Sequence, residues 1–408
     1  MKIKIIHLNI KELLFVLIIM SMIFFVFAFK YINPVFNYVD DIVTVIFLLF
    51  AIIKIMVTKS KKNLNKYDKY IFVLGCILII VGFFGNLISG YQISIRAIAI
   101  DLLSFCKFFG IYLAGMIIFK TDKSDRYYEI AEYFSKFVLL ICLFIAIGNM
   151  LFDWGLADNK NRYGITVYSL GGHPSFASAV TCCCSSILLF NYSKNKKWIL
   201  LGFILTILTV RMKSIVYVAL MGIYLLLYNK NKYFSLKNIV LYAGIGIIIA
   251  RQYIINYFFD VTASRGAALN ASIKLASKFF PIGTGFATFG TVQSITSYSR
   301  AYKIVGLDNR YGFMKTAGSF VGDGGWATEI GQFGIIGVIT LIMMFLFIYC
   351  SIKENIGKKA NYAPFISILL YILICSTSEI SFASNYAVLF AVALVILIKK
   401  GAVKNEKI

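Results

Sequence analysis

Five basic side chains in separate apolar parts of the sequence are placed to form an anion site. Arg211 and Lys213 lie between two apolar runs, Arg96 and Arg251 lie within such runs, and Arg265 follows the last of them. A guanidinium group gives bidentate, charge-assisted hydrogen bonds to phosphate oxygens. Charges within hydrocarbon cost at least about 2.5 to 3.5 kcal/mol, so we expect those in the runs to face the bundle interior or a watery cavity. The residue types predict a membrane-embedded pyrophosphate site.

Two plainer interpretations of these charges stay open. Arg211 and Lys213 could form a tight turn whose long side chains extend into lipid headgroups. Asp101 and Lys107, in the same apolar run as Arg96, could form an internal ion pair.

Acidic residues and one histidine accompany the cations on the same predicted face. Asp40 and Asp41 begin an apolar run, where carboxylates are ordinary partners of a helix dipole. The alternative for that pair is a metal-binding site in the first outer loop. His173, in GGHPS, precedes another run, and it is either a functional group or a surface residue.

The composition is that of a membrane protein. Of the 408 residues, 60% are hydrophobic and 14% are charged, and the mean hydropathy is +0.82. Soluble domains are about a quarter charged. All eight cysteines fall inside apolar runs without a CxxC or Cys/His spacing, so neither disulfides nor a zinc site is indicated.

Apolar runs of roughly the length needed to cross a bilayer recur along the whole chain and predict an all-α polytopic protein. We place about twelve transmembrane helices near 12–29, 41–57, 70–89, 93–119, 134–152, 175–192, 197–210, 213–228, 238–258, 327–350, 361–376 and 384–398.

The net charge of +23 is distributed as a topology signal. Alternate loops hold 26 basic residues on one side and five in the short loops of the other. The positive-inside rule therefore places both termini in the cytoplasm, and no nucleic acid is needed to explain the charge. The expected division is residues 1–258 with helices 1–9, a long extracytoplasmic loop at 259–326, and residues 327–408 with helices 10–12 and a cytoplasmic tail.

The long loop is expected to be structured and functional, because loops of this length are uncommon otherwise. Its aromatic residues suit either sugar stacking or interfacial anchoring; they include Tyr298, Tyr302, Tyr311, Phe313 and Trp326. Gly283, Gly285 and Gly290 lack the preceding strand and the GK[ST] of a nucleotide loop, so we expect a tight turn on the membrane surface.

Three segments resemble one family of membrane glycosyltransferases. SRGAALNASIKLASKFFPIGTGFATFG resembles the arginine-led loop segment, ending in a P-x-x-G-x-G turn, of Wzy-type polysaccharide polymerases and the related O-antigen ligases. DGGWATEIGQFGIIG resembles the next element, which begins with a histidine in ligases. TVRMKSIVYVAL resembles the family's basic turn. Asp323 falls where the ligase histidine would be, which favours a polymerase.

The resemblance implies a GT-C-like bundle in the cytoplasmic (inner) membrane. Its expected activity is transfer of a glycan from an undecaprenyl-pyrophosphate-linked oligosaccharide to a sugar hydroxyl on the outer face. The product would be a surface polysaccharide such as an O-antigen, capsule or exopolysaccharide. The implied partners are this lipid-linked donor, membrane lipids, a flippase and a chain-length regulator, and no cofactor or metal is expected.

The site residues follow from the same resemblance. Clustered cations would stabilise the charge that develops on the leaving pyrophosphate, and a base would take the acceptor hydroxyl proton. We assign substrate binding to Arg211, Lys213, Arg265, Arg96, Arg251, Arg300 and Arg310. Asp323 is the expected base, and His173 and Glu329 are its substitutes.

Other classes of membrane protein compete with this interpretation. A flippase for lipid-linked oligosaccharides also has about twelve spans, but we would expect two similar halves and short outer loops. A ligase-type transferase and a cell-wall polymerase stay open within the superfamily. A noncatalytic scaffold explains the spans and not the cations.

Overall fold

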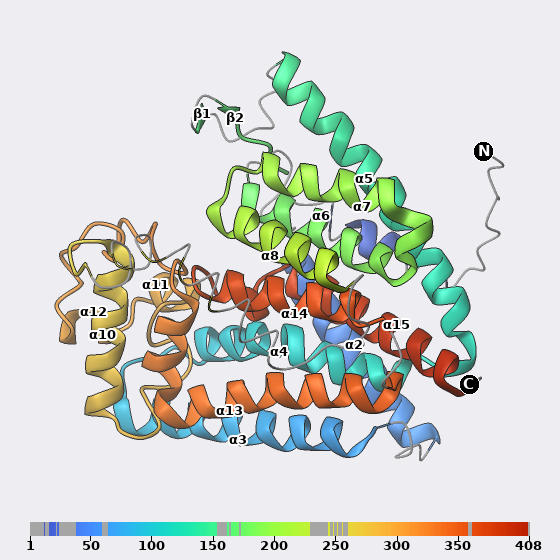
Figure 1. Cartoon of the computed structure of the whole chain (residues 1–408). Coiled ribbons are helices and arrows are strands. Elements are labelled where there is room, and N and C mark those ends of the chain that lie inside the picture. The colour runs from blue at the N-terminus through green and yellow to red at the C-terminus, as the bar shows by residue number, and fades with distance from the viewer. Residues whose placement is uncertain are drawn as a thin grey trace.

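The structure, a computed structural model, describes residues 12, 16–21, 23, 38–58, 64–152, 161–162, 165–170, 173–228, 244, 248, 251, 255, 260–357 and 361–406. These residues are almost entirely helical (Figure 1). The long helices are α2 (Val39–Thr58), α3 (Lys66–Ser89), α4 (Ile95–Ile118), α5 (Ser124–Phe152), α6 (Pro174–Leu188), α7 (Tyr192–Leu208), α8 (Met212–Tyr228), α10 (Ser264–Lys278), α13 (Gly325–Ile356), α14 (Ala363–Ser376) and α15 (Ala387–Glu406). The short elements are α11 (Val292–Thr296), α12 (Ala301–Ile304), three 3-10 turns (Thr121–Lys123, Leu189–Asn191, Ser381–Ala383) and the strands β1 (Asn161–Arg162) and β2 (Ile165–Thr166).

Five of the described helical segments are long and apolar enough to cross a membrane. They are Lys66–Ser89, Ile95–Ile118, Thr121–Phe152, Pro174–Leu208 and Gly325–Ile356. Ten of the twelve predicted spans fall on described helices, whereas 12–29 and 238–258 lie mostly outside the described residues. The protein is thus a helical membrane protein, and the full number of spans stays a prediction.

Local sequence signals set the helix ends. The Asn65 side chain accepts from the Asp68 nitrogen and the Asp68 carboxylate accepts from the Asn65 nitrogen, a capping box that begins α3. Gly90, with φ 60°, ends the same helix in the left-handed conformation. Ser94 caps α4 four residues later, so α3 and α4 are joined by a short turn.

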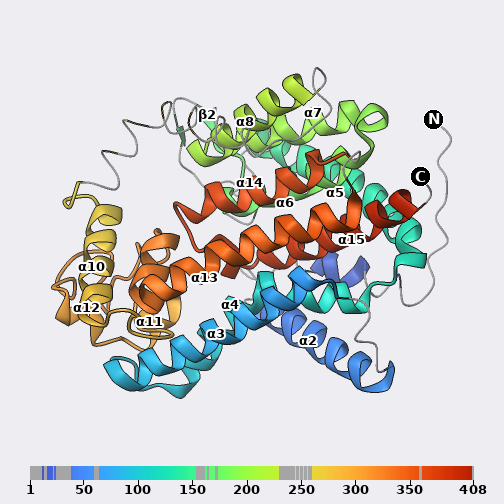
Figure 2. The same ribbon diagram turned by 60° about the horizontal axis from the view of Figure 1, so that its bottom comes forward.

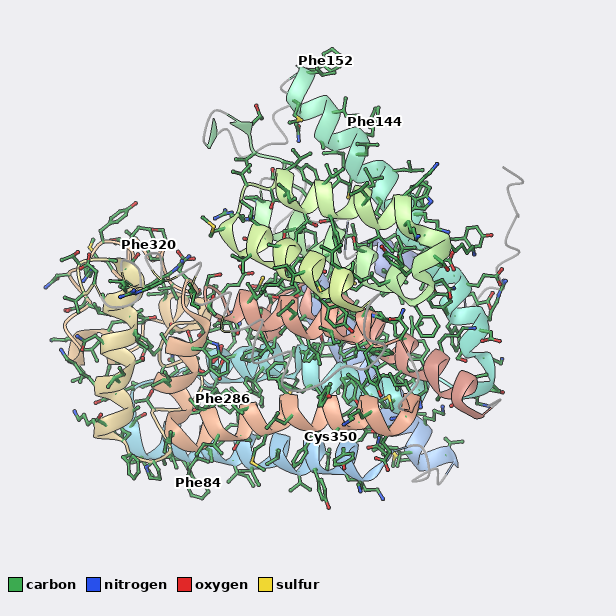
Figure 3. All side chains as sticks on the ribbon, in the orientation of Figure 1. Phe84, Phe144, Phe152, Phe286, Phe320 and Cys350 are labelled. Carbon is green, nitrogen blue, oxygen red and sulfur yellow. The ribbon has the colours of Figure 1, made fainter. Side chains whose placement is uncertain are left out.

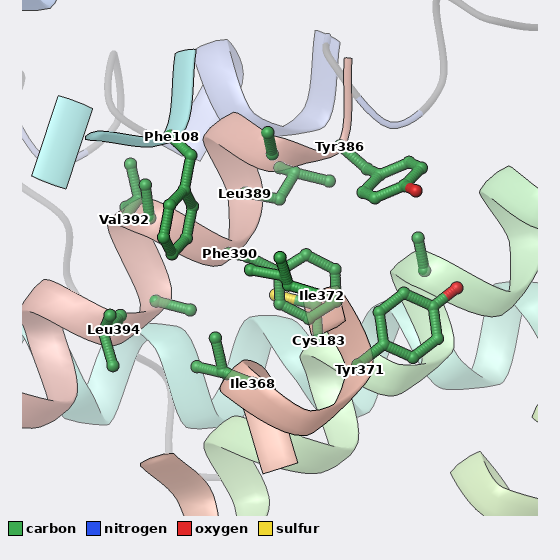
Figure 4. Close-up of a cluster of buried hydrophobic side chains, with 14 of the residues drawn as sticks. Phe108, Cys183, Ile368, Tyr371, Ile372, Tyr386, Leu389, Phe390, Val392 and Leu394 are labelled. Carbon is green, nitrogen blue, oxygen red and sulfur yellow. The ribbon is translucent and has the colours of Figure 1, made fainter. Parts of the chain in front are cut away.

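The helices α3, α4, α13 and α15 lie side by side, with α2 on α4 and the pair α6 and α7 beyond α15 and α14 (Figures 1 and 2). Phe84 on α3, and Phe144 and Phe152 on α5, are each more than half exposed and point away from the bundle (Figure 3). Such exposed rings suit contact with lipid. Inside, Tyr371 and Phe390 stack with ring centroids 5.2 Å apart between α14 and α15 (Figure 4).

Residues 260–324 form a compact layer at one end of the bundle, seen at the left of Figure 1, which we call the loop layer. It has a hydrophobic core of its own, in which Tyr302 packs against Phe289 and Phe313. Tyr302 and Phe313 are buried, so these two rings serve packing and do not offer a surface for sugar stacking. The C-terminal end of α15 lies at the opposite end of the bundle (Figure 1).

The PIGTG turn of this layer is inserted into a break in α13. Gly334, with φ 60° and ψ −156°, interrupts the helix. Thr284 and Gly285 donate backbone hydrogen bonds to the carbonyls of Gly331 and Gln332. The expected tight turn is present, and it packs closely on α3: a Cβ on Gly285 would lie 2.3 Å from the Asn86 nitrogen, near the end of that helix. Its position at the membrane surface stays a prediction. Glycine is required here by close helix contact as well as by its positive φ.

Candidate functional site

The turn between α7 and α8 presents two of the predicted cations. Val210 has φ 47°, a conformation that a β-branched residue adopts only under strain. Hydrogen bonds hold the turn: Thr209 Oγ1 donates to Ser214 Oγ at 3.1 Å, and Ser214 Oγ lies 2.7 Å from Ser178 Oγ of α6. The strained residue immediately precedes Arg211, so the backbone is fixed where the basic residues begin.

Lys213 meets an acidic partner from the far end of α14. Its Nζ lies 2.5 Å from Glu379 Oε1, and the Tyr386 hydroxyl donates to the same carboxylate. Gly325, the first residue of α13, packs so closely on this segment that a Cβ would lie 2.4 Å from the Glu379 carbonyl oxygen. The ends of α8, α13 and α14 therefore meet at one place.

Arg265 and Asp323 join this group from the layer at the end of the bundle. Arg265 Nε donates to the Asp323 carbonyl oxygen at 3.0 Å. Asp323 is exposed to solvent, but neighbouring protein atoms remove part of the hydration of its carboxyl, and this raises the pKa of that group. The charges of Arg265, Lys213 and Arg211 oppose that rise and the charge of Glu379 adds to it.

The structure thus brings together four residues selected from the sequence, and we call Arg211, Lys213, Arg265, Asp323 and Glu379 the mouth cluster. Three cations face two carboxylates, which leaves the cluster with a net positive charge at neutral pH. The helices α8, α10 and α13 all begin here, and their N-terminal dipoles add to the attraction for anions. The arrangement suits binding of a phosphate or pyrophosphate group.

Glu379 is the member of the mouth cluster that the sequence did not single out. It appears in the sequence only as one of several acids on the predicted outer face. Its position between two apolar runs, in STSEIS, places it on the same face as Lys213. This position is the feature of the sequence from which Glu379 could have been selected.

A cavity of about 220 Å³ lies beside the mouth cluster, between α4 and α13. Gly322 and Ile380 line it, and each is adjacent in sequence to a member of the cluster. Asp101 of α4 and Glu329 of α13 both face the cavity. Asp101 accepts from the Ala287 nitrogen at 2.6 Å and from Gln332 Nε2 at 3.1 Å, so it ties the loop layer to the helices.

The ion pair between Asp101 and Lys107, which the sequence left open, is not the one that Lys107 forms. Lys107 Nζ instead lies 2.6 Å from Asp40 and 2.9 Å from Asp41, and all three side chains are largely buried. Lys107 is six residues after Asp101 in α4, and that separation turns the two side chains to different neighbours. Asp40 and Asp41 lie in the first turn of α2, where they neutralise a buried lysine.

The remaining predicted residues lie apart from these contacts. Arg96 and Arg251 are exposed, so they do not face the bundle interior, and the alternative of a watery cavity stays a prediction. Arg300 is exposed at the start of α12. Arg310 donates to the carbonyl oxygens of Val261 and Thr262, which holds the loop layer together.

His173 is exposed and precedes the first residue of α6. Five residues later, Ser178 bonds to Ser214 of α8, so His173 lies at the same end of the bundle as the mouth cluster.

No group of three or more histidine, cysteine or acidic side chains that could hold a metal occurs in the part of the chain that the structure describes. No family model matches the chain, and no curated protein is similar to it. The resemblance to the polysaccharide polymerases therefore stays a prediction from three short segments.

Proposed function

We propose that the protein polymerises undecaprenyl-pyrophosphate-linked oligosaccharide repeat units into a surface polysaccharide on the outer face of the cytoplasmic membrane. The observation that carries the proposal is the convergence of Arg211, Lys213 and Arg265 beside Asp323 at one end of an apolar helix bundle. Elements far apart in the sequence supply these groups, so the cluster is a product of the fold.

In the proposed reaction, the hydroxyl oxygen of an acceptor sugar attacks the anomeric carbon of the donor glycan. The bond from that carbon to the pyrophosphate oxygen breaks, and its electron pair leaves with the lipid pyrophosphate. The three cations stabilise the charge that develops on this leaving group. Asp323 takes the hydroxyl proton as general base and later gives it to water.

The chemistry of these residues suits the two proposed roles, binding of the pyrophosphate by the cations and proton removal by Asp323. A pyrophosphate carries its charge on several oxygens, which suits several cations better than one. The raised pKa of Asp323 brings the carboxyl closer to the working pH, and a base of that kind accepts protons more effectively. The donor already holds the energy for transfer, so a nucleotide is not required.

The test uses a strain that lacks the gene and expresses one variant at a time. Arg265→Ala and Asp323→Asn are compared with Lys274→Ala, an exposed lysine of the same α10, and with Asp308→Asn in the same layer. After membrane levels are matched, surface glycan and lipid-linked intermediates are separated by size. We expect single lipid-linked repeats in the outer leaflet for the first two variants and long chains for the controls. Repeats held in the inner leaflet would instead indicate a transporter.

A further inference from the structure

The cavity beside the mouth cluster is lined by residues other than those proposed to bind the pyrophosphate. Its roughly 220 Å³ is far above the ~10–15 Å³ that holds one water molecule. Amides of Gln293 and Gln332 and hydroxyls of Ser104 and Ser384 line it together with aromatic rings. Most small-molecule sites share this pattern of apolar walls with a few polar groups.

Glu329 is the residue in this cavity that most needs a ligand. It lies in the second turn of α13, only 2% of its surface is exposed, and its Oε2 atom is buried without a hydrogen-bond partner among the described residues. The nearby charge that acts on it is that of Asp101, another acid. A buried carboxyl oxygen without a hydrogen-bond donor is unfavourable unless an occupant supplies the hydrogen bond.

The chemistry of the lining selects the occupant. The described residues that line the cavity include no lysine or arginine to pair with an anion, so a second phosphate does not suit it. Carboxyl, amide and hydroxyl groups exchange hydrogen bonds with neighbouring sugar hydroxyls, and the rings of Phe105, Phe286 and Phe333 offer apolar surface to the sugar carbons.

We propose that this cavity is the subsite for the acceptor sugar and that Glu329 accepts hydrogen bonds from its hydroxyl groups. The inference rests on the proposed function and deepens it. Gly322 and Ile380 place the cavity next to Asp323 and Glu379, so an acceptor held there lies beside the donor's pyrophosphate site. The paired acids make the acceptor sugar one without a carboxylate.

The test varies donor and acceptor separately with the full-length protein in lipid nanodiscs. The donor is the lipid-linked repeat purified from the deletion strain. The acceptor is the repeat-unit oligosaccharide released by partial acid hydrolysis of the strain's own polysaccharide. Glu329→Gln is compared with Glu354→Gln, an exposed glutamate on the same helix. Ala383→Met narrows the cavity without changing its charge.

We expect Glu329→Gln and Ala383→Met to raise the KM for the acceptor about tenfold, while the KM for the donor stays within about twofold. Arg265→Ala should show the opposite pattern, and Glu354→Gln should match wild type. Calorimetric titration of the same oligosaccharide into the protein provides a readout that does not need catalysis, and Glu329→Gln should weaken that binding.

The measurements distinguish failure of the proposed subsite from failure of the proposed function. If wild type transfers glycan and the two cavity variants keep its acceptor KM, the subsite is wrong and the proposed function stands. If wild type transfers nothing but binds the oligosaccharide through Glu329, the polymerase function is wrong and the sugar site stands. An acceptor sugar that carries a carboxylate, bound as tightly by wild type, would also overturn the subsite.

Discussion

The mouth cluster and the neighbouring cavity place charged groups in two different environments. Lys213 and Glu379 pair at 2.5 Å, and Arg265 and Asp323 lie where solvent reaches them. Glu329, in the cavity, is buried, and among the described residues the charge that acts on it is that of another acid, Asp101. Partly exposed cations can exchange their partners for an incoming anion, whereas a buried carboxyl needs a neutral hydrogen-bonding occupant. The contrast separates donor recognition from acceptor recognition.

Removal of a cation from the mouth cluster should have the largest effect. We expect Arg265→Ala to lower the transfer rate by about 10²- to 10³-fold, because a preorganised donor to the developing charge is lost. The rate is measured with the purified lipid-linked repeat. Lys274→Ala on the same helix serves as the control and should retain full activity. Equal losses in both variants would show that general surface charge, and not this cluster, binds the donor.

The loop that walls the cavity should depend strictly on Gly285. Gly285→Ala places a methyl group 2.3 Å from the Asn86 nitrogen at a φ of 93°. We expect destabilisation of about 2–4 kcal/mol, which thermal unfolding in detergent measures. Gly222→Ala in α8, where nothing lies within 4 Å, should be neutral or slightly stabilising. An unchanged midpoint for Gly285→Ala would show that the turn does not pack this closely on α3.

The pH dependence of transfer should report on the Asp323 carboxyl of the mouth cluster. Asp323 acts as a base only when it is ionised, so transfer should rise with pH through its raised pKa. The charge of Arg265 lowers that pKa. Arg265→Ala should therefore move the acid limb of kcat/KM to higher pH, while Lys274→Ala leaves it in place. A limb that stays fixed in Arg265→Ala would remove Asp323 from the role of base.

Relief of strain before Arg211 should have the smallest effect. Val210→Gly replaces a β-branched residue at φ 47° with one that adopts this conformation freely. We expect a gain in stability of about 1 kcal/mol together with a several-fold loss of transfer, since Arg211 is held less firmly. Thermal unfolding and transfer rates of the same preparation test both parts. Lower stability would show that Val210 is not strained.

The sequence predicted where the helices lie and which site residues share one side of the membrane. It did not predict which side chains are in contact. Apolar runs locate α3, α4 and α13 because a bilayer fixes the length of a spanning helix. Alternate loops must share a face, so Arg211, Arg265 and Asp323 could be grouped before any packing was known. Lys107 pairs with Asp40 and not with Asp101 because of the rotation of α4 about its axis, and hydropathy does not predict that rotation.

The cavity is beyond sequence reasoning for the same kind of reason. Residues of α4, of the 286–293 segment and of α13 line it, and the turn at 281–285 that joins this segment to the break at Gly334 connects parts of the chain about fifty residues apart. Glu329 was selected from the sequence only as a substitute base. Its burial and its missing partner come from tertiary packing between α4, α13 and the loop layer.

The most direct test of the central claim is a reconstitution with the purified protein as the sole protein in nanodiscs. Lipid-linked repeats are added, and both glycan length and released lipid pyrophosphate are followed over time. The account predicts a ladder of lengthening chains, with one lipid pyrophosphate released per bond formed, and about 10²- to 10³-fold slower formation of both products with Arg265→Ala. Intact single repeats and no released pyrophosphate with active wild-type preparations would contradict it.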